Sequence, residues 1–361
     1  MAVIRADNLG KSYGSKVAVI DLSFQVNPGS VTGFLGPNGS GKSTTMRLML
    51  GLDNGSGNTT YDGQPFQSLN QPMRHVGVLL EAKPFHPTRT ARNHLRMLAA
   101  ANGISTSRVD EVLAMVGLST VSNGRPKKFS LGMGQRLGMA AALLGDPHTL
   151  ILDEPANGLD PEGIQWLRNL LKQLAGEGRS VFVSSHLLSE MALLADQLVV
   201  IGRGRMIASG QVTDFIRSSD RTSVIVRSPD IERLGPKLAE LGGFVEADPE
   251  DTGAESGLPR YSVKRLSIEQ VGDTAYELGV RLHELFVREA TLEEAFLDAT
   301  ERDQEFSGIE LPPELAGRQP PSTGAAGPPG QATRRPYGEP EVRPSDGSDR
   351  EPPPTHDGDR R

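Results

Sequence analysis

The sequence contains no cysteine, which excludes disulfide bonds, thiolate metal sites and cysteine nucleophiles. It also lacks any apolar run near the roughly 20 residues that a helix needs to cross a bilayer; stretches such as 139–144 are far too short. The first ten residues carry mixed charges, Arg5 and Asp7, and no long apolar segment of the secretory kind. We therefore expect a chain that does not span a membrane and that is compatible with a reducing cytoplasm.

Most of the chain also carries no large excess of positive or of negative charge. The net charge of −7 divides into +4 for residues 1–214, −9 for 215–306 and −2 for 307–361. The first segment is mildly basic, as a domain that binds a polyanion can be, but a nucleic-acid surface normally needs a stronger excess. The acidic second segment argues further against such a surface, so no nucleic-acid partner is expected.

Large apolar side chains are scarce in the last 55 residues, which hold 12 of the 26 prolines. Such a segment buries too little surface to offset the entropy lost on ordering, so we predict a Pro/Gly-rich disordered tail over 306–361. It is either a solvated tail without specific function or a polyproline segment that binds a partner. The length of the whole chain predicts two domains plus extras, and we place the two domains at 1–215 and 216–305.

A glycine-rich loop follows a predicted buried strand at 31–35 and precedes a predicted helix around 46–50. The loop residues are Gly36, Pro37, Asn38, Gly39, Ser40, Gly41, Lys42, Ser43 and Thr44. This is the Walker A pattern in the strand–loop–helix context that it requires. Glycines let the backbone N–H groups wrap closely around phosphates. Lys42 is expected to contact the β- and γ-phosphates, and the Ser43 hydroxyl to bind Mg²⁺.

Two further predicted strands end in polar residues. Residues 148–152 form an apolar run that ends in Asp153 and Glu154, and 180–185 lead to His186. Ligands of open α/β sheets bind at the carboxyl ends of the strands, so these side chains should lie beside the phosphate loop. We expect Asp153 to hold Mg²⁺, Glu154 to polarise the attacking water and His186 to hydrogen-bond the γ-phosphate.

At this point the chain resembles the nucleotide-binding domain of ATP-binding-cassette (ABC) proteins, over residues 1–215. The most diagnostic segment is 130–136, which looks like the family's signature loop, with Ser130 and Gly132 carrying the match and Leu131 and Met133 departing from it. The resemblance implies an α/β P-loop NTPase fold with a RecA-like core, an antiparallel β subdomain and a helical subdomain at about 82–145. It also implies ATP as the nucleotide.

The resemblance implies a head-to-tail homodimer with two ATP molecules between the subunits. Ser130 and Gly132 would face the nucleotide held by the other copy. Residues 156–160, which end in Asp160, look like the D-loop that crosses this interface. Tyr13 stands where an aromatic residue usually stacks on adenine.

One position departs from the family pattern. Residues 76–81 align with a segment that normally ends in a glutamine contacting Mg²⁺ or the attacking water, and Glu81 occupies that place. Glu81 either takes over the role of that glutamine and binds the metal, or it is a solvated glutamate on a loop. The helices after it, with caps expected at Thr90 and Ser107, would present the docking groove to a transmembrane partner.

Residues 222–289 predict the order βαββαβ, a small α+β domain. A cassette with such an extension is similar to drug- and antibiotic-export ATPases of the daunorubicin and bacitracin type. That resemblance implies an ATPase subunit at the cytoplasmic face of the cell membrane, powering export of drugs, antibiotics or lipid-like molecules through a separately encoded permease. The alternatives are a soluble ABC-type mechanoenzyme and a nucleotide-gated regulatory subunit.

Overall fold

The computed structural model describes residues 3–80, 85–86, 88–219, 221–248 and 258–307. Glu81 lies outside these residues, as does the predicted tail from 308 onward. Residues 306 and 307, which the tail prediction includes, belong to the helix Leu292–Ser307. Within the described ranges, no helix combines the length and apolar character needed to cross a membrane.

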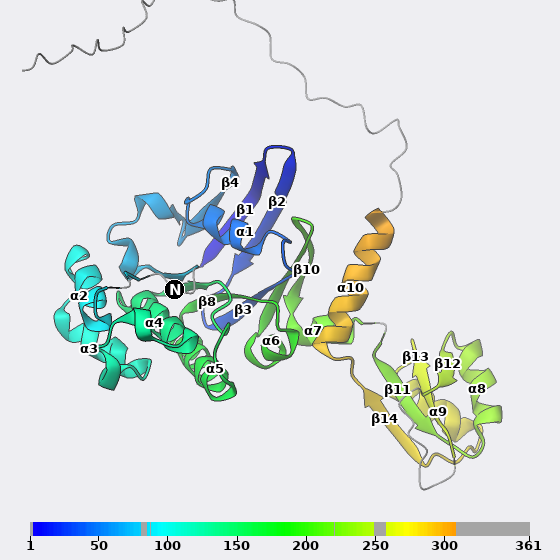
Figure 1. Ribbon diagram of the computed structural model, residues 1–361. Helices are drawn as coiled ribbons and strands as arrows, with labels where there is room; N and C mark the ends of the chain where they lie inside the picture. Colours follow the sequence, from blue (N-terminus) through cyan, green and yellow to red (C-terminus); the bar gives the residue numbers. More distant parts are fainter. Residues whose placement is uncertain (1–2, 81–84, 87, 220, 249–257, 308–361) are drawn as a thin grey trace, which may run out of the picture. The chain divides into compact units, whose positions relative to one another are not determined.

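A six-stranded sheet forms the centre of the N-terminal part of the chain, in the order β10-β9-β3-β8-β7-β6 (Figure 1). Its strands are β3 Ser30–Leu35, β6 Val76–Leu79, β7 Thr149–Leu152, β8 Ser180–Ser185, β9 Gln197–Gly202 and β10 Arg205–Gln211. Neighbouring strands from β9 to β6 run parallel, and β10 pairs antiparallel at the edge. Every residue of β7 and β8 is buried, as expected for a sheet covered on both faces.

A second, antiparallel sheet has the order β2-β1-β4-β5. Its strands are β1 Ile4–Tyr13, β2 Lys16–Val26, β4 Ser56–Tyr61 and β5 Gln64–Pro65. The two sheets share one apolar core, in which Phe24 of β2 lies 5.8 Å from Phe34 and 5.2 Å from Phe182 between ring centroids. Aromatic stacking at these distances adds to the burial of apolar area.

Helices cover both faces of the six-stranded sheet. The helices around it are α1 Lys42–Met49, α4 Leu131–Leu143, α5 Pro161–Gly176, α6 Leu188–Leu194 and α7 Val212–Arg217. Figure 1 shows α4, α5 and α6 on the face opposite the antiparallel sheet, and their apolar side chains share one cluster with β3, β7 and β8. α1 packs against β1, β2 and β4. The α/β fold class is confirmed.

Two helices, α2 Ala91–Ala101 and α3 Thr106–Met115, pack beside α4. Thr90 caps α2 as predicted, accepting a hydrogen bond from the Asn93 N–H. The cap predicted at Ser107 is wrong: Ser105 is in extended backbone and its hydroxyl accepts from the Ser107 N–H, so the helix begins earlier. Both serines suit an N-cap, and only the backbone path selects between them. Short 3-10 turns lie at Phe66–Ser68, Pro72–Arg74, Ser119–Val121 and Pro126–Lys128.

His94 on α2 is buried beside the Phe85 ring, and its Nδ1 atom has no hydrogen-bond partner among the described residues. Burial, with smaller contributions from Arg89 and His86, lowers the pKa of His94 below its ordinary 6.5. The unfolded chain then binds more protons than the folded one as the pH falls below about 6.5. We expect thermal stability to be full above this pH and to decline below it.

Melting curves from pH 7.5 to 5 test this expectation. Replacing His94 with glutamine should flatten the decline, because glutamine does not titrate. The same replacement at exposed His148 is the matched control and should keep the slope of the parent protein. Equal slopes in all three proteins would show that His94 is not the group responsible.

The C-terminal elements are α8 Ile231–Glu240, α9 Ile268–Glu277, α10 Leu292–Ser307, β11 Ser223–Arg227, β12 Phe244–Ala247, β13 Arg260–Lys264 and β14 Glu284–Arg288. Their strands form an antiparallel sheet in the order β12-β13-β11-β14, which confirms the predicted βαββαβ order. Thr291 and Glu294 form a capping box before α10. α10 packs against α6 and α7, with Leu292 and Phe296 in the cluster of the cassette.

Candidate functional site

The glycine-rich loop joins β3 to the first turn of α1. Gly39 and Gly41 have φ values of +81° and +111°, a region that side chains with a Cβ rarely adopt. A Cβ on Gly36 would lie 2.4 Å from the Ile201 carbonyl oxygen. The loop can therefore approach β9 this closely only because residue 36 is glycine. Within the described residues, the buried Ser40 hydroxyl has no hydrogen-bond partner. The loop thus offers a backbone cradle with an unsatisfied hydroxyl, which fits a phosphate ligand.

Lys42 is the charged centre of this loop. Its side chain is 7% exposed, and its ammonium donates hydrogen bonds to the carbonyl oxygens of Gly36 at 2.7 Å and Pro37 at 3.4 Å. Burial lowers the pKa of Lys42, and the nearby negative charges of Glu154 and Asp153 partly oppose this change. Ser43 is exposed at the start of α1, and Thr44 is half-buried beside it.

Asp153 and Glu154 follow β7 at the carboxyl edge of the sheet, next to the ends of β8 and β6. The Ser184 hydroxyl of β8 donates to the buried Asp153 carboxylate and accepts from the Glu154 N–H at 2.9 Å. Ser184 therefore fixes both acidic residues against the neighbouring strand. This contact was not predicted, although a serine at the end of an otherwise apolar strand was the available signal.

Glu154 links the loop to His186. Its Oε1 lies 3.8 Å from Lys42 Nζ, and its Oε2 lies 2.7 Å from His186 Nδ1. The Glu154 backbone has φ +49°, an uncommon conformation for a residue with a side chain, and its carbonyl accepts from Gln135 Nε2 at 3.2 Å. The structure thus brings together Lys42, Glu154 and His186, which the sequence placed on three separate segments.

Ser130 caps α4, because its hydroxyl accepts from the Met133 N–H at 3.1 Å. Gly132 packs against the following loop: a Cβ there would lie 3.2 Å from the Gly158 carbonyl oxygen. Leu131 contacts the same loop, since a Cβ on Gly158 would lie 2.1 Å from Leu131 Cδ2. The segments at 130–136 and 156–160 therefore form one packed unit at the start of α4.

Replacing Gly158 with alanine should disturb this unit. Gly158 has φ +78°, and the added methyl group would collide with Leu131, so we expect destabilisation of about 1–3 kcal/mol. Thermal unfolding measures the effect. Gly176, where a Cβ meets nothing within 4 Å, is the control and should tolerate alanine. Equal melting temperatures for both variants would contradict the packing argument.

Two predicted site residues have partners inside the chain. Asp160 caps α5, accepting from the Gly163 N–H at 2.9 Å. The Tyr13 hydroxyl donates to Asp53 at 2.9 Å, and Arg47 forms two hydrogen bonds of 3.0 Å with the same carboxylate, so the pKa of Asp53 is lowered chiefly by Arg47. The Tyr13 ring is half-exposed. Neither arrangement tests the predicted nucleotide contact.

Comparison with known proteins places the chain in a family. The family model described as ABC transporter matches residues 19–157, and one described as a domain of unknown function matches 222–293. The uncharacterised ABC transporter ATP-binding protein YhcH of Bacillus subtilis is 35% identical over 308 residues, covering 84% of this chain and 97% of its own length. The bacitracin transport ATP-binding protein BcrA of Bacillus licheniformis is 43% identical over 209 residues, covering 57% and 68%.

Solved structures have the same cassette fold. The ATP-binding subunit of an ABC transporter superposes with a TM-score of 0.55 at 28% identity, over 60% of this chain and 92% of its own. The dimeric post-hydrolysis state of the cassette MJ0796 with ADP and phosphate has a TM-score of 0.53 at 23% identity, over 58% and 98%. With the match to YhcH along most of both chains, these findings show that the chain belongs to the ATP-binding proteins of ABC transporters and is an ATP-hydrolysing transporter subunit.

Proposed function

We propose that Lys42, Glu154 and His186 form the hydrolytic centre of this ATPase. The observation that carries the proposal is the Lys42–Glu154–His186 chain of contacts at 3.8 and 2.7 Å, beside the glycine-rich loop. Lys42 binds the β- and γ-phosphates, since it is the buried cation of the loop. Glu154 accepts a proton from the attacking water, and His186 orients Glu154 and contacts the γ-phosphate.

Mg²⁺ fits the donor set at this edge of the sheet. The Ser43 hydroxyl and the Asp153 carboxylate supply the oxygen ligands that the ion prefers, and nucleotide phosphates complete such sites. When bound, the ion neutralises charge on the phosphates during transfer. We assign the third protein ligand to Glu81, on the resemblance of its segment to the family pattern.

Replacing Glu81 with glutamine tests this assignment. Glutamine restores the residue usual in the family and removes one negative charge, so the concentration of Mg²⁺ needed for half-maximal phosphate release should change severalfold, about the effect of one charged ligand. The matched control is the same replacement at Glu240, which pairs with Lys237 on α8. An identical Mg²⁺ dependence in the parent protein and both variants would make Glu81 a passive loop residue.

We further infer that two copies of the chain close head to tail over two ATP molecules. Ser130 and the first turn of α4 are at the surface, where backbone N–H groups and the helix dipole favour a phosphate of the other copy. Gly132 keeps that turn free of a side chain. Asp160 lies at the end of the 156–160 loop, at the interface between the two copies. Tyr13 stacks on the adenine.

The transport role that we propose is export. The subunit itself would lie at the cytoplasmic face of the cell membrane. Relatives named for bacitracin transport and linearmycin resistance are 43% and 36% identical to this chain, which supports drugs, antibiotics or lipid-like molecules as the exported class. The membrane-spanning part would be a separately encoded permease, and the helices α2 and α3 with the preceding segment would dock on it.

Affinity purification of the tagged chain from detergent-solubilised membranes tests this role. We expect a polytopic membrane protein to co-purify in stoichiometric amount and to stimulate phosphate release. Recovery with ribosomes or DNA and without a membrane protein would instead support a soluble mechanoenzyme. A bound membrane protein with no phosphate release under any condition would support a nucleotide-gated regulatory subunit.

A further inference from the structure

Glu154 has a backbone conformation that is unfavourable for a residue with a side chain. Its φ of +49° lies in the left-handed region, where a Cβ crowds the backbone carbonyl that follows it. Such a conformation persists only where the surrounding structure holds it. The direction in which the side chain leaves the backbone depends on this conformation, and so do the contacts of the carboxylate with Lys42 and His186. The groups that hold the Glu154 backbone therefore also aim its carboxylate.

The Glu154 N–H is held by the side chain of Ser184, a fully buried residue of β8. Leu152 pairs with Val183 in the parallel ladder, so Asp153 and Ser184 come next on the two neighbouring strands. The Ser184 hydroxyl accepts a hydrogen bond of 2.9 Å from the Glu154 N–H. Its single hydrogen is then left for the Asp153 carboxylate, to which it donates. Asp153 thus keeps the hydroxyl turned so that it accepts from Glu154.

The Glu154 carbonyl oxygen accepts from two donors among the described residues. The Asn157 N–H donates at 3.1 Å and closes a turn within the loop. Gln135 of α4 donates from its Nε2 atom at 3.2 Å, and its side chain is 1% exposed. The turn bond is local, so the carbonyl would stay partly held without Gln135. The part of the chain that the structure describes offers no second acceptor for the Glu154 N–H, so the Ser184 contact has no such substitute.

We propose that Ser184 and Gln135 are positioning residues for ATP hydrolysis. They hold the two ends of Glu154 in the left-handed conformation, which keeps its carboxylate 2.7 Å from His186 and 3.8 Å from Lys42. Ser184 has the larger effect, because it alone holds the N–H within the described residues. The proposal rests on the role of Glu154 as the base, proposed above. Neither residue needs to contact the nucleotide, since both act through Glu154.

Replacing Ser184 with alanine should slow turnover at saturating ATP about tenfold, the effect of losing one buried hydrogen bond. ATP affinity should stay within about twofold of the parent value, because the glycine-rich loop keeps its contacts. The matched control is Ser262→Ala. Ser262 is also fully buried on a strand, β13, and its hydroxyl has no hydrogen-bond partner among the described residues. We expect the control to turn over ATP at the rate of the parent protein.

Replacing Gln135 with leucine should slow turnover about threefold, less than at Ser184, because the Asn157 N–H still holds the carbonyl. Leucine has a similar size, and the Gln135 Oε1 atom has no hydrogen-bond partner within the described ranges that would be lost.

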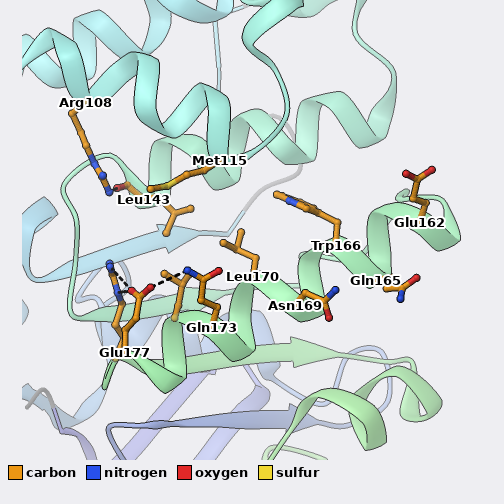
Figure 2. Close-up of a pocket in the computed structure, with 12 residues that line it drawn as sticks. Arg108, Met115, Leu143, Glu162, Gln165, Trp166, Asn169, Leu170, Gln173 and Glu177 are labelled. Atoms are coloured by element: carbon orange, nitrogen blue, oxygen red, sulfur yellow. Dashed lines mark hydrogen bonds and ion pairs between the residues drawn. The ribbon is translucent and has the colours of Figure 1, made fainter.

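Trp166 shows whether α4 moves in the Gln135 variant. It is the only tryptophan in the chain and lines a groove of about 520 Å³ that runs along α5 and faces α3 and the end of α4 (Figure 2). The guanidinium of Arg136, the residue after Gln135, lies 4.4 Å from the centroid of its ring. We expect the emission spectrum of the parent protein. A changed spectrum would attribute the slower turnover to a displaced helix and remove Gln135 from the positioning role.

A double-mutant cycle shows whether the two residues act through Glu154. Ser184→Ala and Gln135→Leu should slow the parent protein but have no further effect on Glu154→Gln protein, measured as labelled phosphate released from ATP. A further tenfold loss on adding Ser184→Ala would overturn the proposal and indicate an effect through Asp153. Equal turnover of folded Ser184→Ala and Ser262→Ala would overturn it as well. Parent-like turnover of Glu154→Gln alone would instead refute the proposed base, so the two failures are distinguishable.

Discussion

Replacing Glu154 with glutamine is expected to slow ATP turnover by at least ~100-fold, the usual contribution of a positioned general base. Glutamine has nearly the same shape but cannot accept the proton of the attacking water. The hydrogen-bonding position opposite His186 is retained, so the loop around Lys42 should keep its geometry and ATP should still bind. Steady-state phosphate release and equilibrium binding of a fluorescent ATP analogue separate these two quantities.

The matched control for this experiment is Glu240→Gln, a loss of the same charge on α8, where Glu240 pairs with Lys237. We expect its turnover to equal that of the parent protein. If Glu154→Gln retained more than a tenth of the parent activity, Glu154 could not be the base, and the water would have to be activated by another group.

Replacing Lys42 with alanine should have a different effect, because it acts on binding. A charge-assisted hydrogen bond contributes about 1.5–3 kcal/mol, so ATP affinity should fall by about 10- to 150-fold. Turnover at saturating ATP should also fall about 100-fold, as when one preorganised donor to a transition-state charge is removed. Titration calorimetry with Mg-ATP measures the first effect.

Lys172→Ala provides the control, since Lys172 is exposed on α5. Lys42 is buried and holds two loop carbonyls, so circular dichroism and a melting curve must accompany the binding experiment. Unchanged affinity in a folded Lys42→Ala protein would remove Lys42 from the nucleotide site.

Much of the cassette could be predicted because its local patterns are strong. The apolar runs at 148–152 and 180–185 can be buried only as central strands, and the glycine-rich loop needs the strand and helix that flank it. The C-terminal order βαββαβ was also predicted, and the structure shows a capping box of Ser267 and Gln270 before α9, which is itself a local pattern. These features depend on residues that are close together in the sequence, so they can be predicted from the sequence alone.

The contacts that hold the site together were harder to predict. The Ser184 hydroxyl bridges Asp153 and Glu154 from a strand 30 residues away, and Gln135 donates to the Glu154 carbonyl from α4. Both depend on the register of strands and helices that are distant in the sequence. The cap at Ser105 was missed for a related reason, because two serines fit the same pattern and the chain path decides between them.

Sequence patterns also could not predict the role of the C-terminal extension or the presence of the groove along α5. Trp166, Leu170 and Leu174 appear in the sequence as one apolar face of a helix, which is normally buried. Only the packing of α3 against the end of α4 leaves part of that face open. The relatives along the full chain share the extension, yet the matching domain is described as one of unknown function.

The most direct test of the central claim is the molar mass of the Glu154→Gln protein, measured by light scattering on a size-exclusion column, with and without ATP and Mg²⁺. Our account predicts the 38.7 kDa monomer without nucleotide and twice that mass with it, because the closed dimer forms but cannot hydrolyse ATP. A monomer under both conditions, with ATP bound, would contradict closure of two copies over the nucleotide.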